Sequence, residues 1–502
     1  MRPPAHCPRA VLAPLLVALL AAAPSLSAEA SGPIRLSPST SDASQRSDAN
    51  RLSMVLTNFG SFAYDITTGS AGLEFPKGSS RTAMFAAGLW VGARVAGGTR
   101  LATAEYSFEY GPGPMIGGGP APDAPEYKVY KVAADDTTGW ADWVAHAGPQ
   151  GAPVTPGGTR PLISGSQTLW TVFNDANPSL HTNEAGSTAP LGLEVRETAW
   201  SWNEPGLRGN VIFLRFLLIN GGSNTLDSAY VGLWSDPDLG GFTDDLTGCD
   251  VSLDLGYCYN STNNDAVYGL APPAVGIKLI AGPHDPVTGE RLPMTSFIRY
   301  INGTDPNSAD KTYNFLRGLN GDGTPIVNPV TTLPTTYMMS GDPVTATGWL
   351  DDTPSDRRFL IGSGPFTLGP GQSDEVVAAV IMGQGHDRLS SITALRASAQ
   401  SPTTDAPLAR AVGLELAIGP NPVIGPVTVT FAPAAGESWR LDAFDLSGRR
   451  VSEVARGEGR GAVETRRFDL ARGELALRPG IYWLRLASGS RSVARRVVVL
   501  EP

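Results

Sequence analysis

The chain has 502 residues, including 58 Gly and 42 Pro, with only 17% charged residues and a mean hydropathy of −0.07. This length allows two or three domains with a sizeable core, and the composition excludes a wholly disordered chain. The formal net charge is −10, yet residues 414–502 carry 13 Arg, no Lys and 10 acidic residues, so the rest of the chain is mildly acidic, with 25 basic and 38 acidic residues. The large region therefore lacks the basic stripe that nucleic-acid binding requires, and no nucleic-acid partner is expected.

The first thirty residues have the organisation of a secretory signal peptide. Arg2 and Arg9 form a short basic region, and residues 11–23 are apolar and uncharged. Small residues at positions 25–30 offer a cleavage site, and the apolar run is too short to cross about 30 Å of hydrocarbon. We therefore expect residues 1–30 to be removed on export, leaving a secreted or cell-surface protein with no transmembrane segment.

Two segments rich in Ser, Asp, Thr and Pro divide the remaining chain. We interpret residues 31–50 and 401–413 as linkers. Between them, short apolar runs with β-branched and aromatic residues alternate with Gly and Pro turns, which is typical of antiparallel sandwiches. The predicted fold class is all-β. A large β-sandwich-type region of one or two subdomains spans residues 51–400, and a small sandwich spans residues 414–502.

Individual elements of the large region can be predicted from periodicity. Residues 388–400 form the best helix candidate, because Leu389, Ile392 and Leu395 recur at helical spacing. Strands 198–202 and 210–219 are predicted to form a hairpin. Further strands are predicted at residues 52–58, 83–93, 228–234, 358–362 and 375–382. We expect Trp140, Trp143, Trp170, Trp200, Trp202 and Trp234 to belong to an aromatic core, with a sugar-stacking platform as the alternative.

Two cysteines remain after signal cleavage, Cys249 and Cys258. Residues 251–259 alternate as in a half-buried strand, with Cys249 in phase and Cys258 out of phase. In one continuous strand they would face opposite sides and lie roughly 30 Å apart at about 3.3 Å per residue. A disulfide, which export would permit, requires the chain to reverse, for example at Gly256. We expect free thiols and keep the disulfide as the alternative.

Four motifs occur in order near the C-terminus: Pro-Asn-Pro at 420–422, Asp-Leu-Ser-Gly-Arg-Arg-Val at 445–451, Gly-Ile-Tyr-Trp-Leu-Arg-Leu at 480–486, and a terminal Val-rich strand. Together they resemble the type A sorting domain of type IX secretion cargo. The residues that carry the resemblance are Pro420, Asn421, Pro422, Asp445, Gly448, Arg449, Gly480 and Tyr482.

This resemblance implies that residues 414–502 form an immunoglobulin-like β-sandwich, which acts as a C-terminal sorting domain. It also implies export across the inner and outer membranes, with the type IX secretion machinery as partner. The ending of this chain is rich in Arg, whereas such domains usually end in Lys-rich sequence. Residues 75–79, 88–92 and 234–238 resemble parts of uncharacterised N-terminal regions of such cargo, to which no activity is attached.

The most unusual segment of the large region is residues 234–250, in which five carboxylates fall within a Gly-containing loop. They are Asp236, Asp238, Asp244, Asp245 and Asp250. Carboxylates this close repel one another unless they are well solvated or share a cation, and Ca²⁺ takes six to eight oxygen ligands from flexible loops. The spacing is not that of an EF-hand. These residues are candidate ligands of a structural Ca²⁺, and a solvated acidic loop is the alternative. Asn320-Gly321-Asp322-Gly323 is interpreted as a plain turn.

The sequence contains no coherent catalytic set. Asn203-Glu204-Pro205 is similar to an acid/base motif of some barrel glycosidases, but it falls in the predicted hairpin loop and has no paired carboxylate. The histidines after the signal peptide lack metal or catalytic spacing, and we interpret them as loop or surface residues: His146, His181, His284 and His386.

The sequence therefore favours a secreted or cell-surface protein, exported by its C-terminal sorting domain, with a non-enzymatic binding or structural middle region. An extracellular polysaccharide or a surface component is a candidate partner. Two alternatives stay open. One is an extracellular hydrolase acting on glycans, and the other is a structural component of a surface layer.

Overall fold

A computed structural model describes residues 43–155 and 157–400. In the C-terminal segment it describes residues 416–419, 423, 426–431, 438–445, 449–459, 464–470, 472, 477–488 and 491–500. The predicted signal peptide, most of the first linker and the linker 401–413 lie outside the described residues. No helix in the described part of the chain has the length and apolar character needed to cross a membrane.

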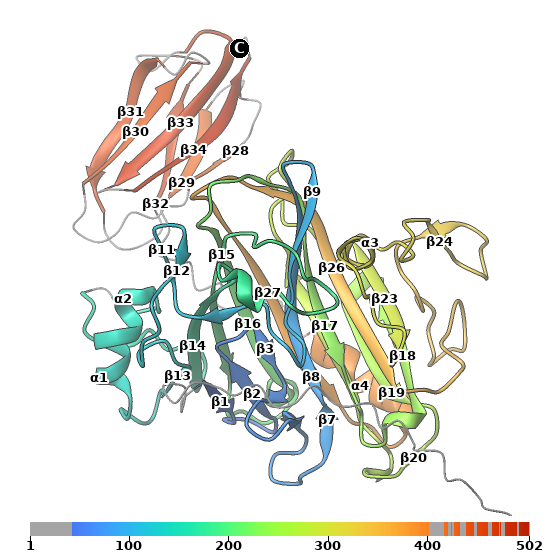
Figure 1. The fold of residues 1–502 in the computed structure, drawn as a ribbon. Helices are drawn as coiled ribbons and strands as arrows, with labels where there is room; N and C mark the ends of the chain where they lie inside the picture. Colours follow the sequence, from blue (N-terminus) through green and yellow to red (C-terminus); the bar gives the residue numbers. More distant parts are fainter. Residues whose placement is uncertain are drawn as a thin grey trace, which may run out of the picture. The chain divides into compact units, whose positions relative to one another are not determined.

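The all-β prediction is confirmed: two large antiparallel sheets dominate the region before residue 400 (Figure 1). The first sheet has ten strands and contains the neighbours β23-β26-β17-β8. Its strands are β1 (Ser44–Ser47), β2 (Ser53–Thr57), β3 (Ser61–Phe62), β6 (Leu73–Glu74), β7 (Thr82–Met84), β8 (Ala86–Val95), β9 (Gly98–Ala102), β17 (Leu226–Asp236), β23 (Ser296–Ile301) and β26 (Arg357–Leu368).

The second sheet has nine strands and contains the order β14-β15-β16-β27-β22-β19-β18. Its strands are β10 (Gly111–Pro112), β13 (Tyr130–Ala133), β14 (Gln167–Asn174), β15 (Leu193–Ser201), β16 (Val211–Asn220), β18 (Asp245–Asp250), β19 (Leu255–Asn260), β22 (Ala274–Ala281) and β27 (Ser373–Gly383). Small two-stranded pairs decorate the loops: β4 (Tyr64–Asp65) with β5 (Ser70–Ala71), β11 (Met115–Ile116) with β12 (Gly119–Pro120), β20 (Asn264–Asp265) with β21 (Gly269–Leu270), and β24 (Ile326–Val327) with β25 (Pro334–Thr335).

The two sheets pack face to face through apolar side chains. The rings of Phe62 on β3 and Phe216 on β16 lie 6.4 Å apart, centroid to centroid. Gly256 on β19 lies against Phe297 of β23 and Ile361 of β26, where a side chain would collide with both. The large region is therefore a sandwich whose main core lies between the sheets.

Helices cover part of each outer face. Helix α3 (Ala309–Leu316) begins at Ser308, whose hydroxyl accepts a hydrogen bond from the Lys311 N–H, and it packs on the ten-stranded sheet beside Trp90 and Trp234. Helix α4 (Arg388–Gln400) confirms the predicted helix. Its Ile392 buries against the nine-stranded sheet. The short helices are α1 (Trp140–Asp142), continued by a π turn at Trp143–Ala147, and α2 (Gly148–Gln150).

The expectation of an aromatic core holds for most of the six tryptophans. Trp143, Trp170, Trp200 and Trp234 are almost completely buried. Trp200 stacks on Phe213, with ring centroids 5.3 Å apart. The predicted hairpin is also confirmed, because β15 and β16 pair in antiparallel register across the loop 202–210.

Two expectations are corrected by strand pairing. Ser44–Ser47, at the end of the predicted linker 31–50, forms β1 because its backbone pairs with β2. The predicted continuous strand through 249–259 is wrong. The chain reverses at Val251–Leu253, with Asp254 in the left-handed conformation at φ 51°, and β18 and β19 form a hairpin.

This reversal does not bring the two thiols together as a bridge. Cys249 lies opposite Gly256, and Cys258 lies opposite Thr247, so the cysteines are diagonal neighbours on the two strands. Both are free and buried, as expected.

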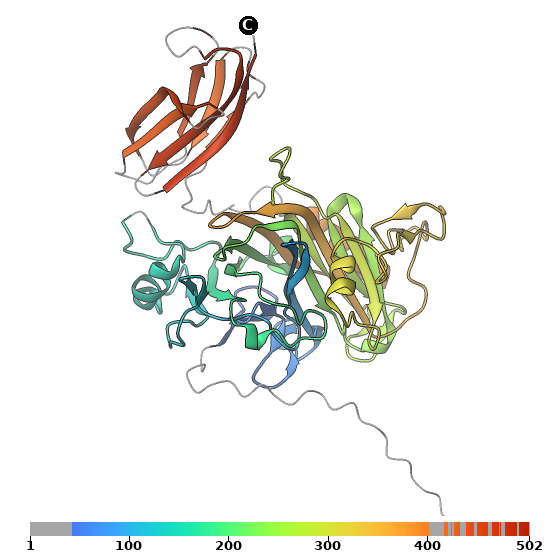
Figure 2. The same ribbon diagram turned by 45° about the horizontal axis from the view of Figure 1, so that its top comes forward.

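The C-terminal segment contains two further antiparallel sheets (Figure 2, orange to red). The three-stranded sheet has the order β28-β29-β32 and the four-stranded sheet the order β31-β30-β33-β34. Their strands are β28 (Leu416–Gly419), β29 (Pro426–Phe431), β30 (Ser438–Phe444), β31 (Arg450–Glu458), β32 (Glu464–Asp469), β33 (Gly480–Ser488) and β34 (Arg491–Val499). One buried cluster contains Phe431 of the first sheet and Trp439 and Leu484 of the second, so the segment is a small sandwich.

The structure places part of the predicted sorting motif. Pro420, Asn421, Pro422 and Gly448 lie outside the described residues. The Arg449 Nε atom lies 3.0 Å from Asp445 Oδ2. The Tyr482 hydroxyl donates a 2.9 Å hydrogen bond to the carbonyl of Arg478, and Gly480 begins β33.

Candidate functional site

Three carboxylates meet where two neighbouring strands of the ten-stranded sheet come together. Asp236 is the last residue of β17, Asp238 follows it, and Asp356 immediately precedes β26. The two strands are antiparallel, with Ser235 opposite Phe359, so the end of one meets the beginning of the other. Asp236, Asp238 and Asp356 each offer a carboxylate oxygen, and these oxygens lie within 4.8 Å of one another. We call these three residues the acidic cluster.

A single guanidinium lies beside the acidic cluster. The Nη1 atom of Arg358 donates a 2.8 Å hydrogen bond to Asp356 Oδ1, and its Nη2 atom lies 3.3 Å from Asp236 Oδ2. Its Nε atom lies 3.6 Å from Asp305 Oδ1. One positive charge therefore faces several carboxylates, and the site keeps a surplus of negative charge when all of them are ionised.

Asp236 is the most enclosed member of the cluster, with a side chain only 3% exposed. Tyr106 donates a hydrogen bond to its Oδ2 atom, while Oδ1 has no hydrogen-bond partner among the described residues. Burial raises the pKa of Asp236 to about 8, although Arg358 opposes this shift. Burial and the neighbouring Asp356 raise the pKa of Asp238 to about 6. Asp236 thus holds a proton at neutral pH that a bound cation would displace.

The donor set suits a hard cation. All three cluster side chains supply oxygen and none supplies nitrogen or sulfur, which favours Ca²⁺, Mg²⁺ or Mn²⁺ over Zn²⁺. Asp238 and Asp356 are only half-buried, so solvent reaches the cluster from their side. These residues fit a calcium site in which carboxylates share the coordination with backbone carbonyls or water.

The other three acidic residues of the predicted site have separate partners. Asp244 Oδ1 accepts a 3.1 Å hydrogen bond from Asn260. Asp245 is buried, and its Oδ2 atom accepts a 3.1 Å hydrogen bond from the N–H of Leu239. Asp250 pairs with Arg396, whose Nε atom lies 3.0 Å from Asp250 Oδ2. Of the five predicted ligands, the structure therefore brings together Asp236 and Asp238.

Sequence reasoning did not find Asp356 or Arg358. Arg358 lies 122 positions after Asp236, so no local spacing connects them. The available signal was the short polar run Asp356-Arg357-Arg358 at the entrance to an apolar strand.

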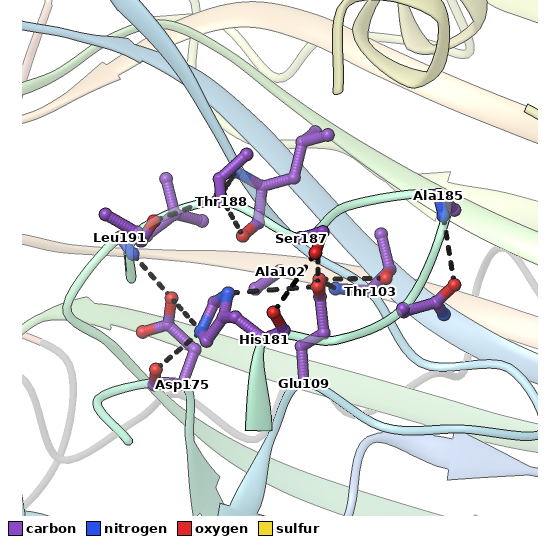
Figure 3. A network of polar contacts seen from close by, with 12 residues as sticks. Ala102, Thr103, Glu109, Asp175, His181, Ala185, Ser187, Thr188 and Leu191 are labelled. Carbon is purple, nitrogen blue, oxygen red and sulfur yellow. Dashed lines mark hydrogen bonds and ion pairs between the residues drawn. The ribbon is translucent and has the colours of Figure 1, made fainter. Parts of the chain in front are cut away.

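A second buried polar network surrounds His181 (Figure 3). The His181 Nε2 atom lies 2.8 Å from the backbone carbonyl of Asp175, and its Nδ1 atom lies 3.9 Å from Glu109 Oε1. Glu109 accepts hydrogen bonds from the N–H groups of Ser187 (2.7 Å) and Thr103 (2.9 Å). His181 lies in a loop, as expected, and its side chain is only 1% exposed, so it is a buried loop residue and not a surface residue.

The same network fixes the two ends of its loop. Asp175 accepts 2.6 Å hydrogen bonds from the N–H groups of Leu191 and Leu193. Burial raises the pKa of Asp175 to about 6 and also raises the pKa of Glu109. The carboxylates are occupied by backbone donors, so the network holds residues 175–193 in place. The His181 Nδ1 atom is buried and has no hydrogen-bond partner among the described residues.

Two open hollows lie elsewhere on the described surface. One, of about 310 Å³, is lined by Lys128, Asp136, Asp142 and their neighbours, and the other, of about 500 Å³, by Glu184, Ser187 and Asn307–Ala309. Neither includes the acidic cluster or His181. The described carboxyl groups whose pKa is raised are therefore not among the residues that line these two hollows.

The remaining polar motifs have ordinary structural settings. His146 and His386 are exposed, and His284 lies 2.7 Å from Asp374. Glu204 lies in the β15–β16 loop and pairs with Arg208 at 3.5 Å. Asp322 accepts a 3.0 Å hydrogen bond from the N–H of Thr324 in an exposed turn, as expected.

Comparison with known proteins adds little to this geometry. No protein-family model matches the sequence, and no curated protein matches it. Among solved structures, a polysaccharide lyase is similar at 8% identity and a TM-score of 0.20, covering 61% of this chain and 34% of the other. Heparan sulfate lyase HepC from Pedobacter heparinus is similar at 9% identity and a TM-score of 0.21, covering 73% and 42%.

The dimeric latent form of PorU from Porphyromonas gingivalis is similar at 10% identity and a TM-score of 0.16, covering 67% of this chain and 31% of PorU. This chain therefore spans between about a third and two fifths of the length of these structures. Likeness at these TM-scores assigns neither a fold family nor an activity.

Proposed function

We propose that this is an exported, non-enzymatic binding or structural protein, whose large β-sandwich is stabilised by a structural Ca²⁺ at the acidic cluster. The observation that supports the cation is the convergence of Asp236, Asp238 and Asp356 around one guanidinium, with an oxygen of Asp236 left without a hydrogen bond. Asp236 is buried and the cluster lines neither described hollow, so a structural role fits it better than catalysis.

The proposed route of export rests on the sequence motifs at the two ends of the chain. The basic and apolar N-terminal segment supports passage across the inner membrane. The C-terminal motifs support recognition by the type IX secretion machinery, followed by display on the cell surface or release. An extracellular polysaccharide or a surface component is the proposed partner of the middle region.

Thermal unfolding of the full chain tests the cation site. The midpoint temperature is measured in millimolar Ca²⁺ and in chelator, for the wild type and for Asp238→Asn and Asp356→Asn. We expect chelator to lower the wild-type midpoint by several degrees, because a ligand that binds only the folded state stabilises it. The two variants should lose most of this response.

Asp244→Asn is the matched control, because it removes a carboxylate of the same loop that lies outside the acidic cluster. It should keep the full Ca²⁺ response. Superimposable wild-type curves with and without chelator would refute the cation site. A lost response in Asp244→Asn, with a retained response in Asp356→Asn, would move the site away from the cluster.

Export is tested separately in a host that has type IX secretion. The full chain should reach the medium or the cell surface, whereas a chain ending at residue 413 should accumulate in the periplasm. Equal release of both forms would refute the sorting role of residues 414–502 and leave the cation site untouched.

A further inference from the structure

The outward face of the four-stranded C-terminal sheet is built from arginine and aromatic residues. On β33, Leu484 and Leu486 point into the core, so Ile481, Trp483 and Arg485 point outward and are exposed. Residues directly opposite one another on antiparallel strands share a face. The pairs Arg450–Phe444, Phe444–Trp483 and Trp483–Arg496 therefore place one continuous row across all four strands.

Parallel rows add further arginines to this face. Asp442 lies opposite Arg485 and Glu453, and Arg440 lies opposite Arg456. We call the outward residues Arg440, Arg450, Arg456, Trp483, Arg485 and Arg496 the arginine face. Neighbours in a row lie about 4.8 Å apart, and neighbours along a strand about 6.5 Å apart, so the cations form a closely spaced array.

The arginines of this face are exposed to solvent, whereas the most central carboxylate, Asp442, is buried beneath them. The side chains of Arg440 and Arg456 are 46% and 79% exposed. Asp442, with no exposed side-chain surface, lies 2.7 Å from Arg440 Nε and 3.0 Å from Arg450 Nε. Five guanidinium groups against three carboxylates, Asp442, Glu453 and Glu458, leave the face net positive, although the chain before residue 414 is net acidic.

The aromatic part of the face is equally unusual. Trp483 is 43% exposed and Ile481 beside it is 39% exposed, whereas most tryptophans of the main sandwich are buried. The Arg485 guanidinium lies over the Phe444 ring, 4.7 Å from its centroid, which holds its plane against the sheet. An indole and ordered guanidinium forks thus lie side by side on one flat surface.

We propose that the arginine face binds an acidic extracellular polysaccharide. Guanidinium forks bind carboxylate or sulfate groups in bidentate geometry, and the exposed indole provides an apolar platform for the ring faces of sugars. β33 pairs with β30 on one side and β34 on the other, so an extended peptide cannot add as a strand beside Trp483. The surface therefore fits a ligand that is recognised by side chains and not by backbone hydrogen bonds. The inference concerns residues distinct from the acidic cluster and does not depend on a bound cation.

Binding of the full chain to heparin, a carboxylated and sulfated polysaccharide, tests the proposal. Affinity is measured in solution over a range of salt concentrations. The wild type should bind with an affinity that falls as salt rises. Arg485→Gln/Arg496→Gln should weaken binding at least about tenfold, since it removes two charge-assisted contacts. Trp483→Ala should also weaken it, with a smaller change in salt dependence.

Arg467→Gln/Arg472→Gln is the matched control, because it removes the same charge from exposed positions elsewhere in the C-terminal segment. It should bind heparin within about twofold of the wild type. Arg485→Lys/Arg496→Lys keeps the charge and loses the planar guanidinium. Its affinity for heparin should lie between those of the wild type and the Gln variant. Thermal unfolding midpoints establish that each variant folds.

Three results would overturn the proposal. If Arg467→Gln/Arg472→Gln weakened heparin binding as much as Arg485→Gln/Arg496→Gln, the affinity would depend only on the net charge of the segment. Polyglutamate or duplex DNA binding as tightly as heparin would mean that the face recognises any polyanion, or an acidic peptide, and not a polysaccharide. Absence of heparin binding at low salt would exclude the site altogether.

Discussion

Arg358 holds Asp236 and Asp356 with one guanidinium: its Nη2 atom lies 3.3 Å from Asp236 Oδ2, and its Nη1 atom lies 2.8 Å from Asp356 Oδ1. This single cation compensates only part of the charge that the surrounding carboxylates carry when ionised. The stability of the acidic cluster therefore depends on whether a proton or a metal ion neutralises the remaining negative charge.

Removing the guanidinium should expose this dependence. Arg358→Gln leaves the buried Asp236 and the half-buried Asp356 without their guanidinium donor, which should lower the free energy of unfolding in chelator by about 1–3 kcal/mol. Ca²⁺ should then stabilise the variant more than the wild type, because the cation replaces the lost charge. Urea unfolding with and without Ca²⁺ measures both quantities. A variant with an unchanged or smaller Ca²⁺ response would contradict a shared role of Arg358 and the cation.

Cation binding should also depend on pH. The pKa of Asp236 is raised to about 8, above its ordinary value of 3.8, so the folded state holds a proton that the unfolded state releases. In chelator, the contribution of Asp236 to stability is full at low pH and declines as pH rises from about 4 towards 8. Ca²⁺ displaces this proton, so its affinity should rise over the same interval. Calorimetric titration from pH 5.5 to 8 tests this, and a pH-independent affinity would count against Asp236 as a ligand.

Glu197 on β15 provides a separate pH effect inside the core. It is fully buried between Thr171 on β14 and Phe216 on β16, and neither carboxyl oxygen has a hydrogen-bond partner among the described residues. Burial raises its pKa well above the ordinary value, so its contribution to stability falls as pH rises above about 4.5. Glu197→Leu should remove this slope and stabilise the protein at pH 8 by about 1–3 kcal/mol. Parallel curves for variant and wild type from pH 5 to 8 would show that Glu197 does not titrate in this way.

The network around His181 should control the order of its loop. Asp175→Asn replaces one of two accepting oxygens with an amide donor, so the Leu191 and Leu193 N–H groups can no longer both be satisfied. We expect a cost of about 1–3 kcal/mol and faster hydrogen exchange in residues 176–192. Exchange mass spectrometry measures this directly, with Asp322→Asn in an exposed turn as control. Unchanged exchange in the loop would mean that Asp175 does not hold it.

The two cysteines should remain reduced and unreactive in the folded protein. Diagonal neighbours on antiparallel strands lie about 7–8 Å apart, beyond the roughly 4 Å between Cβ atoms that a disulfide requires. Burial also raises the pKa of both thiols, which suppresses the reactive thiolate. In a Cys7→Ser chain, a thiol reagent should therefore react with Cys249 and Cys258 only after denaturation. Rapid labelling in the native state, or failure to label either thiol in denaturant without reductant, would contradict this.

Local patterns predicted the elements well where a single period governs the side chains. The helix at 388–400 and the β15–β16 hairpin follow directly from apolar spacing and turn residues. The same approach failed at 249–259, because alternation continues on both sides of a tight reversal and does not mark the turn at Asp254. It failed also for β1, whose polar residues become a strand by pairing with β2.

By itself, the sequence determined the all-β class and the region in which acidic residues concentrate. These properties depend on composition and on neighbours close along the chain. Only the tertiary structure decided which carboxylates meet, because Asp236 and Asp356 are brought together by the antiparallel pairing of β17 with β26. It also decided that His181 is buried and that the arginines of four strands share one face. Contacts between distant segments depend on strand order and register, which no local pattern encodes.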